Sequence, residues 1–539
     1  MNQQQFDYII IGAGSAGCLL AKRLTEDRDV KVLLLEAGKQ DNYLWIHVPV
    51  GYLYCIDNPR TDWRFRTAAE PGLNGRALIY PRGKVMGGSS SINGMIYMRG
   101  QDADYERWAD VTGDASWAWP EALRRYKKFE DYYGDNDPWH QQGGEWRVER
   151  QRLKWDILEI FRHAAAEAGI PYSDDFNRGD NFGVGYFDVN QRSGWRLNAS
   201  RAFLNEARPN LTLRTGALVK QLKIDPASKR CLGVEYIQDG SMHFAEARKE
   251  VLLSAGAIGS VQILERSGIG SAHRLDRLGI KVHSDLPGVG ENLQDHLQLR
   301  MVYRVHDIST LNTKANSLWG KAMIGLEYLL KRSGPMAMAP SQLGAFAYSS
   351  PDQTRANVEY HVQPLSLGKF GEPLHPFNAF TASVCNVRPT SRGSVHIGSV
   401  DVDAAPEIKP NYLSTDEDRR VAIDSLQLTR RILSSPAFMR YRPEEYKPGK
   451  QHQSDEQLVK AAGDIGTTIF HPVGTCKMGR SDDPMSVLDS ELRVKGIQSL
   501  RVVDASAMPY ITSGNTAAPT MMIAERLAEL LTAAAKKSP

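Results

Sequence analysis

The sequence predicts an α/β fold in which a parallel-sheet domain is joined to a second domain of mixed α and β character. Three observations predict this fold. A strand, a glycine-rich turn, a helix and another strand follow one another within residues 6–36, and a further strand-rich block lies near residues 211–253. Residues 300–460 carry short alternating strands between Pro and Gly residues. Strands alternating with helices are typical of a parallel sheet, while a separate run of short strands indicates another domain.

The N-terminal segment reads as a βαβ unit. Residues 6–11 form a short apolar run, as in a parallel strand buried on both faces. Residues 16–24 carry apolar side chains at helical spacing, and residues 32–35 are another buried strand. Residues 521–531 place Ile523, Leu527, Leu530 and Leu531 on one face, which predicts a final helix packed on the core. Further strands are expected at 211–213, 219–222, 251–253, 358–362 and 394–397.

The composition is that of an ordinary globular enzyme. Of 539 residues, 42% are hydrophobic and 24% charged, and the formal net charge is +3, which gives no electrostatic case for binding nucleic acid. No apolar run reaches 18 residues, so we expect no transmembrane segment, although peripheral contact with the inner membrane is compatible with these data. Strand residues begin at Phe6, which leaves no room for a signal peptide.

The five cysteines are scattered and show no CxxC spacing, so the sequence predicts neither a disulfide framework nor a metal site. A reduced, cytoplasmic protein is therefore expected.

A dinucleotide fingerprint follows the first strand. Residues 12–17 read Gly-Ala-Gly-Ser-Ala-Gly, and Glu36 ends the next strand. In such a motif Gly12 permits a tight turn, Gly14 lets a pyrophosphate approach the backbone, and Gly17 lets the helix pack on the strand. The helix N-terminus attracts the pyrophosphate, and Glu36 is expected to hold ribose hydroxyls. The alternative is an unoccupied Gly-rich turn. The motif does not separate NAD from FAD, although the length of the chain favours FAD.

Longer motifs extend this interpretation. Residues 83–100 (GKVMGGSSSINGMIYMRG) resemble the first signature of the glucose–methanol–choline (GMC) flavoprotein oxidoreductases. Residues 256–270 resemble the second signature, with Val261 where that family usually has Pro or Ser. The segments 286–296, 471–479 and 501–506 also look like family segments, so the resemblance covers roughly residues 6–531.

The resemblance implies a GMC fold, with a Rossmann-like FAD-binding domain built from discontinuous segments and a substrate-binding domain with an antiparallel sheet. We expect the FAD-binding domain at 1–160, 195–300 and 462–539, and the substrate-binding domain at 161–194 and 301–461.

The resemblance also implies two catalytic residues. His471 matches the family's general base, and a histidine suits that role because its ordinary pKa leaves it neutral near physiological pH. Asn515 matches a second active-site position, where an amide could stabilise an alkoxide. Taken alone, His471 would be read as a core histidine and Asn515 as the cap of the last helix. A helix that starts near Thr516 would direct its positive end at the flavin.

The motif matches assign the cofactor contacts. Ile92 stands where some members carry a histidine bonded to the flavin, so noncovalent FAD is expected. The remaining contacts are Gly12, Gly14, Ser15, Ala16, Glu36, Ala37, Trp63, Gly83, Met86, Gly87, Gly88, Ser91, Asn93, Gly94, Met95, Val219, Ala255, Asp504, Ala505, Asn515 and Thr516.

The expected reaction is oxidation of a primary alcohol with an alkyl or aryl tail to an aldehyde, by hydride transfer to flavin N5. Residues 60–63, 74–76 and 97–100 resemble the choline- and alcohol-dehydrogenase branch, which favours a quinone or dye-type acceptor over O2. A choline dehydrogenase, an aryl- or furfuryl-alcohol oxidase, a redox-silent hydroxynitrile lyase and an NAD-binding regulatory module stay open as alternatives. The substrate wall is expected to use aromatic side chains: Trp45, Tyr52, Tyr54, Trp63, Trp319, Tyr328, Tyr360 and Phe370.

Overall fold

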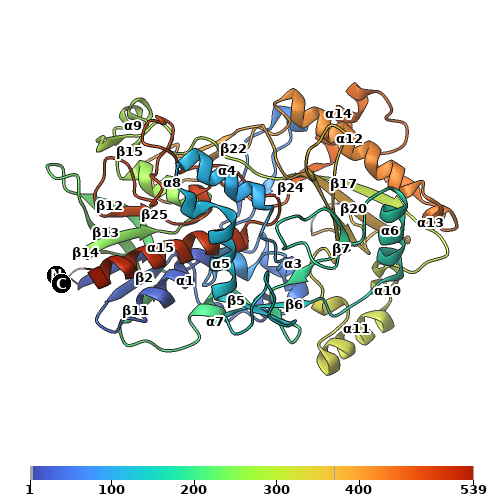
Figure 1. The fold of residues 1–539 in the computed structure, drawn as a ribbon, viewed down its shortest axis with the longest axis horizontal. Helices are drawn as coiled ribbons and strands as arrows, with labels where there is room; N and C mark the ends of the chain where they lie inside the picture. The colour runs from blue at the N-terminus through green and yellow to red at the C-terminus, as the bar shows by residue number, and fades with distance from the viewer. Residues whose placement is uncertain (1–3, 369–370, 538–539) are drawn as a thin grey trace.

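A computed structural model describes residues 4–368 and 371–537 and contains two large sheets, one towards each end of the molecule (Figure 1). The first sheet has seven strands in the order β11-β2-β1-β14-β13-β12, with β25 beside β14. Its strands are β1 (Gln4–Ile11), β2 (Val32–Glu36), β11 (Leu211–Thr215), β12 (Leu218–Ile224), β13 (Cys231–Gln238), β14 (Ser241–Leu253) and β25 (Leu500–Val502).

The part of this sheet around β1 is parallel. β1 pairs in parallel with β2 and β14, and β11 and β25 extend the parallel part on either side. The sheet becomes antiparallel where β13 pairs with β14 and β12. Helix α1 (Ser15–Leu24) packs against α15 (Ala517–Lys537), and both run alongside the sheet with the chain termini at one end (Figure 1). The predicted βαβ unit and the predicted last helix are therefore confirmed.

The second large sheet is antiparallel in each of its strand pairs and has the order β23-β17-β20-β19-β18-β7, with β24 beside β17. One face packs on α6 (Asp156–Glu167) and α12 (Asp416–Leu433) and buries alternate residues such as Leu299, Tyr360 and Phe380 in a common core. The strands are β7 (Gly183–Tyr186), β17 (Leu297–Arg304), β18 (Leu343–Ala347), β19 (Val358–Gln363), β20 (Ala379–Asn386), β23 (Glu444–Lys447) and β24 (Gly466–Thr468).

The other α-helices are shorter or lie between the sheets and the surface: α2 (Leu44–His47), α3 (Tyr52–Cys55), α4 (Asp102–Thr112), α5 (Trp119–Phe129), α7 (Ala199–Phe203), α8 (Gly256–Arg266), α9 (Ala272–Arg277), α10 (Leu311–Ala315), α11 (Leu318–Lys331), α13 (Pro436–Met439) and α14 (Asp455–Ile465). Small sheets use β3 (Phe65–Arg66), β4 (Ile79–Tyr80), β5 (Glu130–Tyr132), β6 (Trp146–Arg150), β8 (Asp188–Val189), β9 (Gln191–Arg192), β10 (Trp195–Arg196), β15 (Ile269–Gly270), β16 (Ser284–Asp285), β21 (Ser394–His396) and β22 (Glu407–Lys409).

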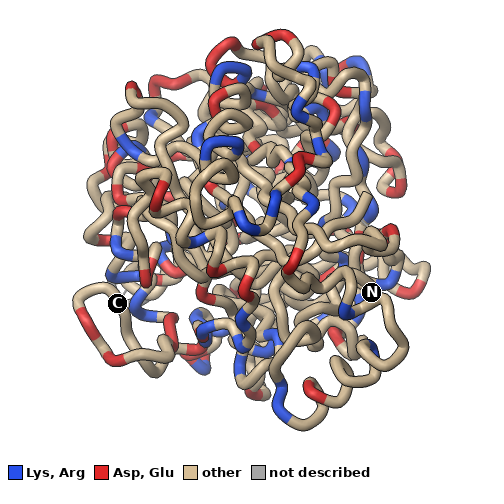
Figure 2. Tube along the Cα trace, turned by 90° about the vertical axis from the view of Figure 1, so that its right-hand side faces the viewer, with Lys and Arg blue, Asp and Glu red and all other residues tan. Residues whose placement is uncertain are grey.

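The predicted α/β class with a second, antiparallel sheet is confirmed, with one difference in detail. The strand expected at 394–397 is β21, which pairs with β22 in a sheet of its own, and its Val395 packs in the core of the first large sheet. Within the described residues, no helix combines the length and the apolar character that a membrane crossing needs. Cationic and anionic residues are interspersed over the face shown in Figure 2, in keeping with the small net charge.

Candidate active site

The largest cavity among the described residues has a volume of about 1610 Å³ and is lined from both large sheets. The ends of β1 and β2 contribute Ile11 and Glu36, while β17 and β19 contribute Arg300 and His361. His471 and Asn515 also line it. So do most of the expected cofactor contacts: Gly12, Gly14, Ser15, Ala16, Glu36, Ala37, Trp63, Gly83, Gly88, Asn93, Gly94, Met95, Val219, Ala255, Asp504, Ala505 and Thr516.

Three expected contacts lie just behind the lining. The amide of Met86 donates to the Lys39 carbonyl, and the amide of Gly87 donates to the Ala13 carbonyl. The Ser91 hydroxyl donates to the Met86 carbonyl. In this arrangement Met86, Gly87 and Ser91 shape the loop that faces the Gly-rich turn.

The Gly-rich turn fits a dinucleotide. A Cβ on Gly12 would lie 2.5 Å from the Ser254 carbonyl oxygen, and one on Gly17 would lie 1.9 Å from the Gly12 oxygen, so both glycines are required by close backbone packing. The nearest atom to a Cβ on Gly14 would be the Cα of Gly88, at 4.0 Å. Gly14 therefore borders open cavity space at the start of α1, where a pyrophosphate can meet free amides.

Two buried carboxylates border the same part of the cavity. Glu36 accepts hydrogen bonds from the amides of Ala13 (2.9 Å) and Gly38 (2.7 Å), and burial raises its pKa to about 7. Asp504 accepts from the amide of Gly256 (2.9 Å) and the hydroxyl of Ser260 (2.6 Å). Asp504 also accepts from the amide and hydroxyl of Ser506, so its acceptor sites are filled by the protein and it fixes the loop at the cavity wall. Each carboxylate oxygen of Glu36 accepts one of the two amides and keeps a lone pair that can accept from ribose hydroxyls. The residues present thus fit the FAD that the motifs imply.

The segment before His471 is held in an unusual backbone conformation. Phe470 has a φ of 70°, which is rare for a residue with a side chain and costs free energy. Its amide donates to the Thr468 hydroxyl (2.7 Å), and its carbonyl accepts from the Arg82 guanidinium (2.6 Å). The amide of His471 donates to Asp295 Oδ1 at 2.8 Å. The backbone on both sides of the imidazole is therefore fixed.

A chain of hydrogen bonds sets the tautomer of His471. The Val387 carbonyl can only accept, so the Nε2 of His296, 3.1 Å away, carries a proton and donates it. The Nδ1 of a neutral His296 is then an acceptor, and it receives a proton from Nδ1 of His471 at 3.1 Å. It follows that Nε2 of His471, the nitrogen on the Asn515 side, carries the free lone pair.

Asn515 agrees with this assignment. Its Nδ2 lies 3.1 Å from His471 Nε2, as a donor to that lone pair must, while its Oδ1 is buried and has no protein partner among the described residues. Burial holds the pKa of His471 well below its usual value. The imidazole is therefore neutral at physiological pH, which is the form that can accept a proton.

Asp295 holds the backbone of both histidines in place through its side chain. Its carboxylate is buried and accepts from the amides of His296 (2.9 Å) and His471 (2.8 Å) and from the hydroxyls of Tyr80 (2.9 Å) and Thr468 (2.6 Å). The sequence alone assigns no role to Asp295 or His296. The available signal is the Leu-Gln-Asp-His segment at 293–296, which resembles a family segment.

Only some of the aromatic side chains expected in the substrate wall line the cavity. Tyr52, Tyr54 and Trp63 line the cavity, but Tyr360 packs in the core on the opposite face of β19, and Trp319 is 76% exposed on α11. Tyr328 and Trp45 belong to a small apolar cluster beside the cavity. Phe370 lies outside the described residues.

Glu359, His361 and Cys385 form a buried group whose ligand-type atoms lie within 4.8 Å of one another. Glu359 Oε1 is 3.2 Å from His361 Nε2, but neither atom has a hydrogen-bond partner among the described residues. This group could not be expected from the sequence, because Cys385 meets Glu359 and His361 only through the pairing of the two consecutive strands β19 and β20.

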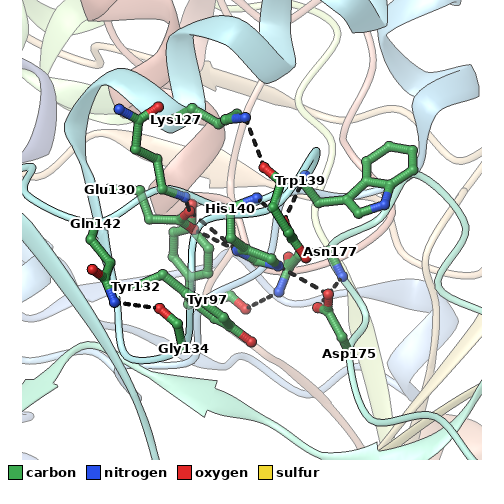
Figure 3. Close-up of polar contacts among 12 residues, drawn as sticks. Tyr97, Lys127, Glu130, Tyr132, Gly134, Trp139, His140, Gln142, Asp175 and Asn177 are labelled. Atoms are coloured by element: carbon green, nitrogen blue, oxygen red, sulfur yellow. Dashed lines mark hydrogen bonds and ion pairs between the residues drawn. The ribbon is translucent and has the colours of Figure 1, made fainter.

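A separate buried network anchors the end of the first signature (Figure 3). Arg99 donates to Glu130 Oε1 (2.6 Å), and His140 lies between Glu130 (3.2 Å) and Asp175 (2.9 Å). Burial alone would raise the pKa of Asp175, but the hydrogen bond from His140 lowers it to about 2. The Arg99 amide also donates to Asn177 (2.9 Å), so this network holds the segment at 97–99 that follows the expected flavin contacts at 93–95.

Comparisons with known proteins agree with this geometry. Residues 6–298 and 389–524 match the N- and C-terminal profiles described as GMC oxidoreductase. The chain is 38% identical over 532 residues to an alcohol dehydrogenase (acceptor) of Pseudomonas putida, covering 98% of this chain and 95% of the relative. It is 39% identical over 541 residues to an oxygen-dependent choline dehydrogenase of Photobacterium profundum, covering 99% and 94%.

Solved structures give the same result. The pyridoxine 4-oxidase from Mesorbium loti superposes with a TM-score of 0.89 at 31% identity, covering 98% of this chain and 99% of that one. The formate oxidase of Aspergillus oryzae RIB40 gives a TM-score of 0.90 at 25% identity, covering 99% of both chains. The chain therefore belongs to the GMC oxidoreductase family, which implies an FAD cofactor, an alcohol substrate and an electron acceptor, and it acts on CH–OH donors.

Proposed function

We propose that this protein oxidises a primary alcohol with an alkyl or aryl tail to the aldehyde, with His471 as the general base. The main support for this role is the neutral imidazole of His471. Its unprotonated Nε2 lies 3.1 Å from Asn515 Nδ2 at the cavity wall. Bound FAD supplies the acceptor for the carbinol hydride at flavin N5. His471 Nε2 takes the hydroxyl proton, and Asn515 Nδ2 donates to the oxygen on which negative charge develops.

The assigned tautomer supports this division of roles. Proton transfer to Nε2 produces an imidazolium whose Nδ1–H stays bonded to His296, so the ring need not turn during the reaction. The helix α15 begins at Ala517, and Asn515, Thr516 and Ala517 all line the cavity. Its positive end would favour negative charge that collects on the cofactor. The cofactor contacts predicted from the motifs remain part of this proposal.

Noncovalent binding of FAD is part of the proposal. Ile92 lines the cavity and has no nucleophilic atom with which to form a bond to the flavin. Acid precipitation should therefore release all flavin into the supernatant, as measured by its absorbance. Flavin that stays with the protein pellet would contradict this part.

Electrons are proposed to leave to a quinone or a dye-type carrier at a membrane surface, which α11 is suited to contact. Six large apolar side chains of this helix are exposed, beside the two exposed lysines Lys321 and Lys331, and Leu318 and Leu330 are 87% and 73% exposed. The helix projects from the body of the molecule (Figure 1), and its residue Ile324 lines the cavity. Apolar residues with a Trp on an exposed helix suit a lipid interface. The six apolar side chains are Leu318, Trp319, Met323, Leu326, Leu329 and Leu330.

Cosedimentation with vesicles of phosphatidylcholine and phosphatidylglycerol tests the membrane contact. The wild type should bind, and a Leu326→Glu, Leu330→Glu double variant should not. Equal binding by both proteins, or binding by neither, would contradict it. The buried free cysteines fit the proposed cytoplasmic compartment, and fractionation of cells provides the corresponding measurement.

One experiment tests the central reaction. Alcohols of aliphatic, benzylic, furanic and amino type, choline included, are mixed anaerobically with the holoenzyme, and flavin absorbance at 450 nm is followed. We expect bleaching by primary alcohols with apolar tails and slower bleaching by choline. No bleaching by any alcohol would instead favour the cyanohydrin-cleaving alternative, and a purified protein without flavin would favour the NAD-binding one. Repetition in air separates an oxidase from a dehydrogenase.

A further inference from the structure

Arg300 is an unpaired cation in the cavity wall. It lies on β17 and lines the cavity, yet no described residue forms a hydrogen bond or an ion pair with its guanidinium. Burial lowers its pKa, and the nearby Tyr52 offsets this only in part. An arginine nevertheless stays protonated in proteins. A positive charge is therefore held among largely apolar surroundings without a partner, which costs free energy unless something else supplies the partner.

The strand register places this charge on the same face as the catalytic site. Arg300 pairs with Ser383 of β20, which pairs with His361 of β19, and paired residues of an antiparallel sheet point to the same side. Gln298 and His361, like Arg300, line the cavity. The alternate residues Leu299 and Met301 point into the core on the other face. The side chain of Arg300 thus faces the space in which the substrate must lie.

Arg300 lies on the strand that directly follows His296, the hydrogen-bond partner of the proposed base. His296, which contacts His471, comes four residues earlier, and four residues of extended chain span about 13 Å. Arg300 is therefore too far along the strand to act on the hydroxyl that His471 deprotonates. It is placed to bind the opposite end of an elongated substrate.

Four carboxylate side chains of described residues line the cavity, and none of them forms an ion pair with Arg300: Glu36, Glu372, Asp464 and Asp504. Glu36 and Asp504 lie at the nucleotide end and accept hydrogen bonds from backbone amides and hydroxyls. Asp464 accepts from the Asn74 amide group at 2.7 Å. A single guanidinium can bind one carboxylate through two parallel hydrogen bonds, which gives both charge balance and orientation. A quaternary ammonium at this position would be repelled.

We propose that the preferred substrate carries a carboxylate at the end remote from its primary alcohol, and that Arg300 binds this carboxylate. This inference rests on the proposed function and names the substrate class of that site. The predicted class is hydroxy acids with an alkyl or aryl body between the two ends. Such a body fits the apolar part of the cavity wall, to which Met338, Leu365 and Ile324 belong.

Matched substrate pairs test the proposal. Rates of anaerobic flavin reduction are compared for 4-(hydroxymethyl)benzoate against 4-methylbenzyl alcohol, and for 6-hydroxyhexanoate against 1-hexanol. We expect the second-order rate constant of flavin reduction to be at least ~10-fold higher for the carboxylate of each pair, since the guanidinium gains a charge-assisted hydrogen bond that the matched alcohol cannot form. In Arg300→Leu this ratio should fall at least ~10-fold, and Arg300→Lys should restore part of it.

A matched variant removes the same charge elsewhere. Arg304 lies on the same strand but does not line the cavity. The variant Arg304→Leu should therefore keep the wild-type ratio between the carboxylate substrate and its matched alcohol. A wild-type ratio near one, or a ratio that Arg300→Leu leaves unchanged, would overturn the inference while the proposed alcohol oxidation stands.

Binding provides a readout that does not depend on turnover. Calorimetric titration of the holoenzyme with 4-methylbenzoate, which has no hydroxyl to oxidise, should give a Kd that rises at least ~10-fold in Arg300→Leu. If no alcohol bleaches the flavin, the proposed function fails, and Arg300-dependent binding of 4-methylbenzoate would still support a carboxylate site. An equal Kd in both proteins would reject that site.

Discussion

The Nδ1 atoms of His296 and His471 lie 3.1 Å apart, so only one of them can carry a proton when both rings are neutral. The Val387 carbonyl decides which one, because it requires the proton of His296 to be on Nε2. The backbone oxygen of Val387, which directly follows β20, thereby determines which nitrogen of His471 is unprotonated and can accept a proton. This relationship makes His296 a positioning residue for His471.

Replacement of the base should abolish most of the chemistry. We expect His471→Ala to slow flavin reduction by at least ~100-fold, because general-base catalysis contributes about 10²–10⁴-fold. Stopped-flow measurement at 450 nm with a primary alcohol checks this. His306→Ala, which removes an exposed imidazole beside Glu444, serves as control and should reduce at the normal rate. Near-normal reduction by His471→Ala would mean that another group is the base.

Replacement of His296 should test the tautomer directly. In His296→Leu the Nδ1 proton of His471 has no acceptor, so both tautomers become populated and the reduction rate should fall roughly 10-fold or more. His296→Gln keeps an amide oxygen that can accept and an NH2 that can donate to Val387, so it should recover part of the rate.

The pH profile separates positioning from simple damage to the structure. Burial is the main cause of the low pKa of His471. The neutral ring of His296, however, accepts from Nδ1–H of His471 and so favours the imidazolium, and the acidic limb of kcat/KM should therefore move to lower pH in His296→Leu. An unshifted limb with a lowered plateau would show that His296 acts only on structure.

The two glycines of the Gly-rich turn should respond differently to the same substitution. Gly17→Ala places a Cβ 1.9 Å from a backbone oxygen, so we expect loss of soluble, folded protein. Gly14→Ala meets open cavity space, so the chain should fold but bind FAD at least ~10-fold more weakly. Expression, circular dichroism and FAD titration measure these effects. Full FAD affinity in Gly14→Ala would place the pyrophosphate elsewhere.

The Asp295 carboxylate should matter for stability as well as for the site. Asp295→Asn replaces an oxygen acceptor by an NH2 group among several donors, and we expect a loss of about 3 kcal/mol in the free energy of unfolding. Urea unfolding of the holoenzyme measures it. Asp174→Asn, at a carboxylate that is 89% exposed, is the matched control and should change the stability by less than about 0.5 kcal/mol. A similar change in both variants would contradict the proposed role.

Acid should destabilise the protein through its buried imidazoles. Burial lowers the pKa of both His471 and His296 in the folded state, while in the unfolded chain both return to about 6.5. As the pH falls below about 6.5, the unfolded chain binds protons that the folded one does not, so the free energy of unfolding decreases. In His471→Gln this decrease between pH 6.5 and 5 should be smaller. An identical slope in wild type and variant would show that His471 does not contribute.

Much of the fold and the cofactor end of the site could be predicted from the sequence. The Gly-rich turn, β1, β2 and α15 are local features, because their patterns lie within short segments that each form one element. His471 and Asn515 could be named only through longer motifs, and a lone histidine or asparagine would have been assigned to the core or to a helix cap. The domain boundaries and the individual cofactor contacts stay predictions.

The sequence by itself determined the class of fold, the nucleotide-binding turn and the residue types available for proton transfer. Tertiary structure decided which nitrogen of His471 is free, which aromatic side chains reach the cavity and that Arg300 faces it without a partner. The physical reason is the separation along the chain between the residues that interact. A turn or a helix is specified by neighbours along the chain, whereas a tautomer or an unpaired charge depends on atoms contributed by strands that are tens to hundreds of residues apart and meet only when the sheets pack.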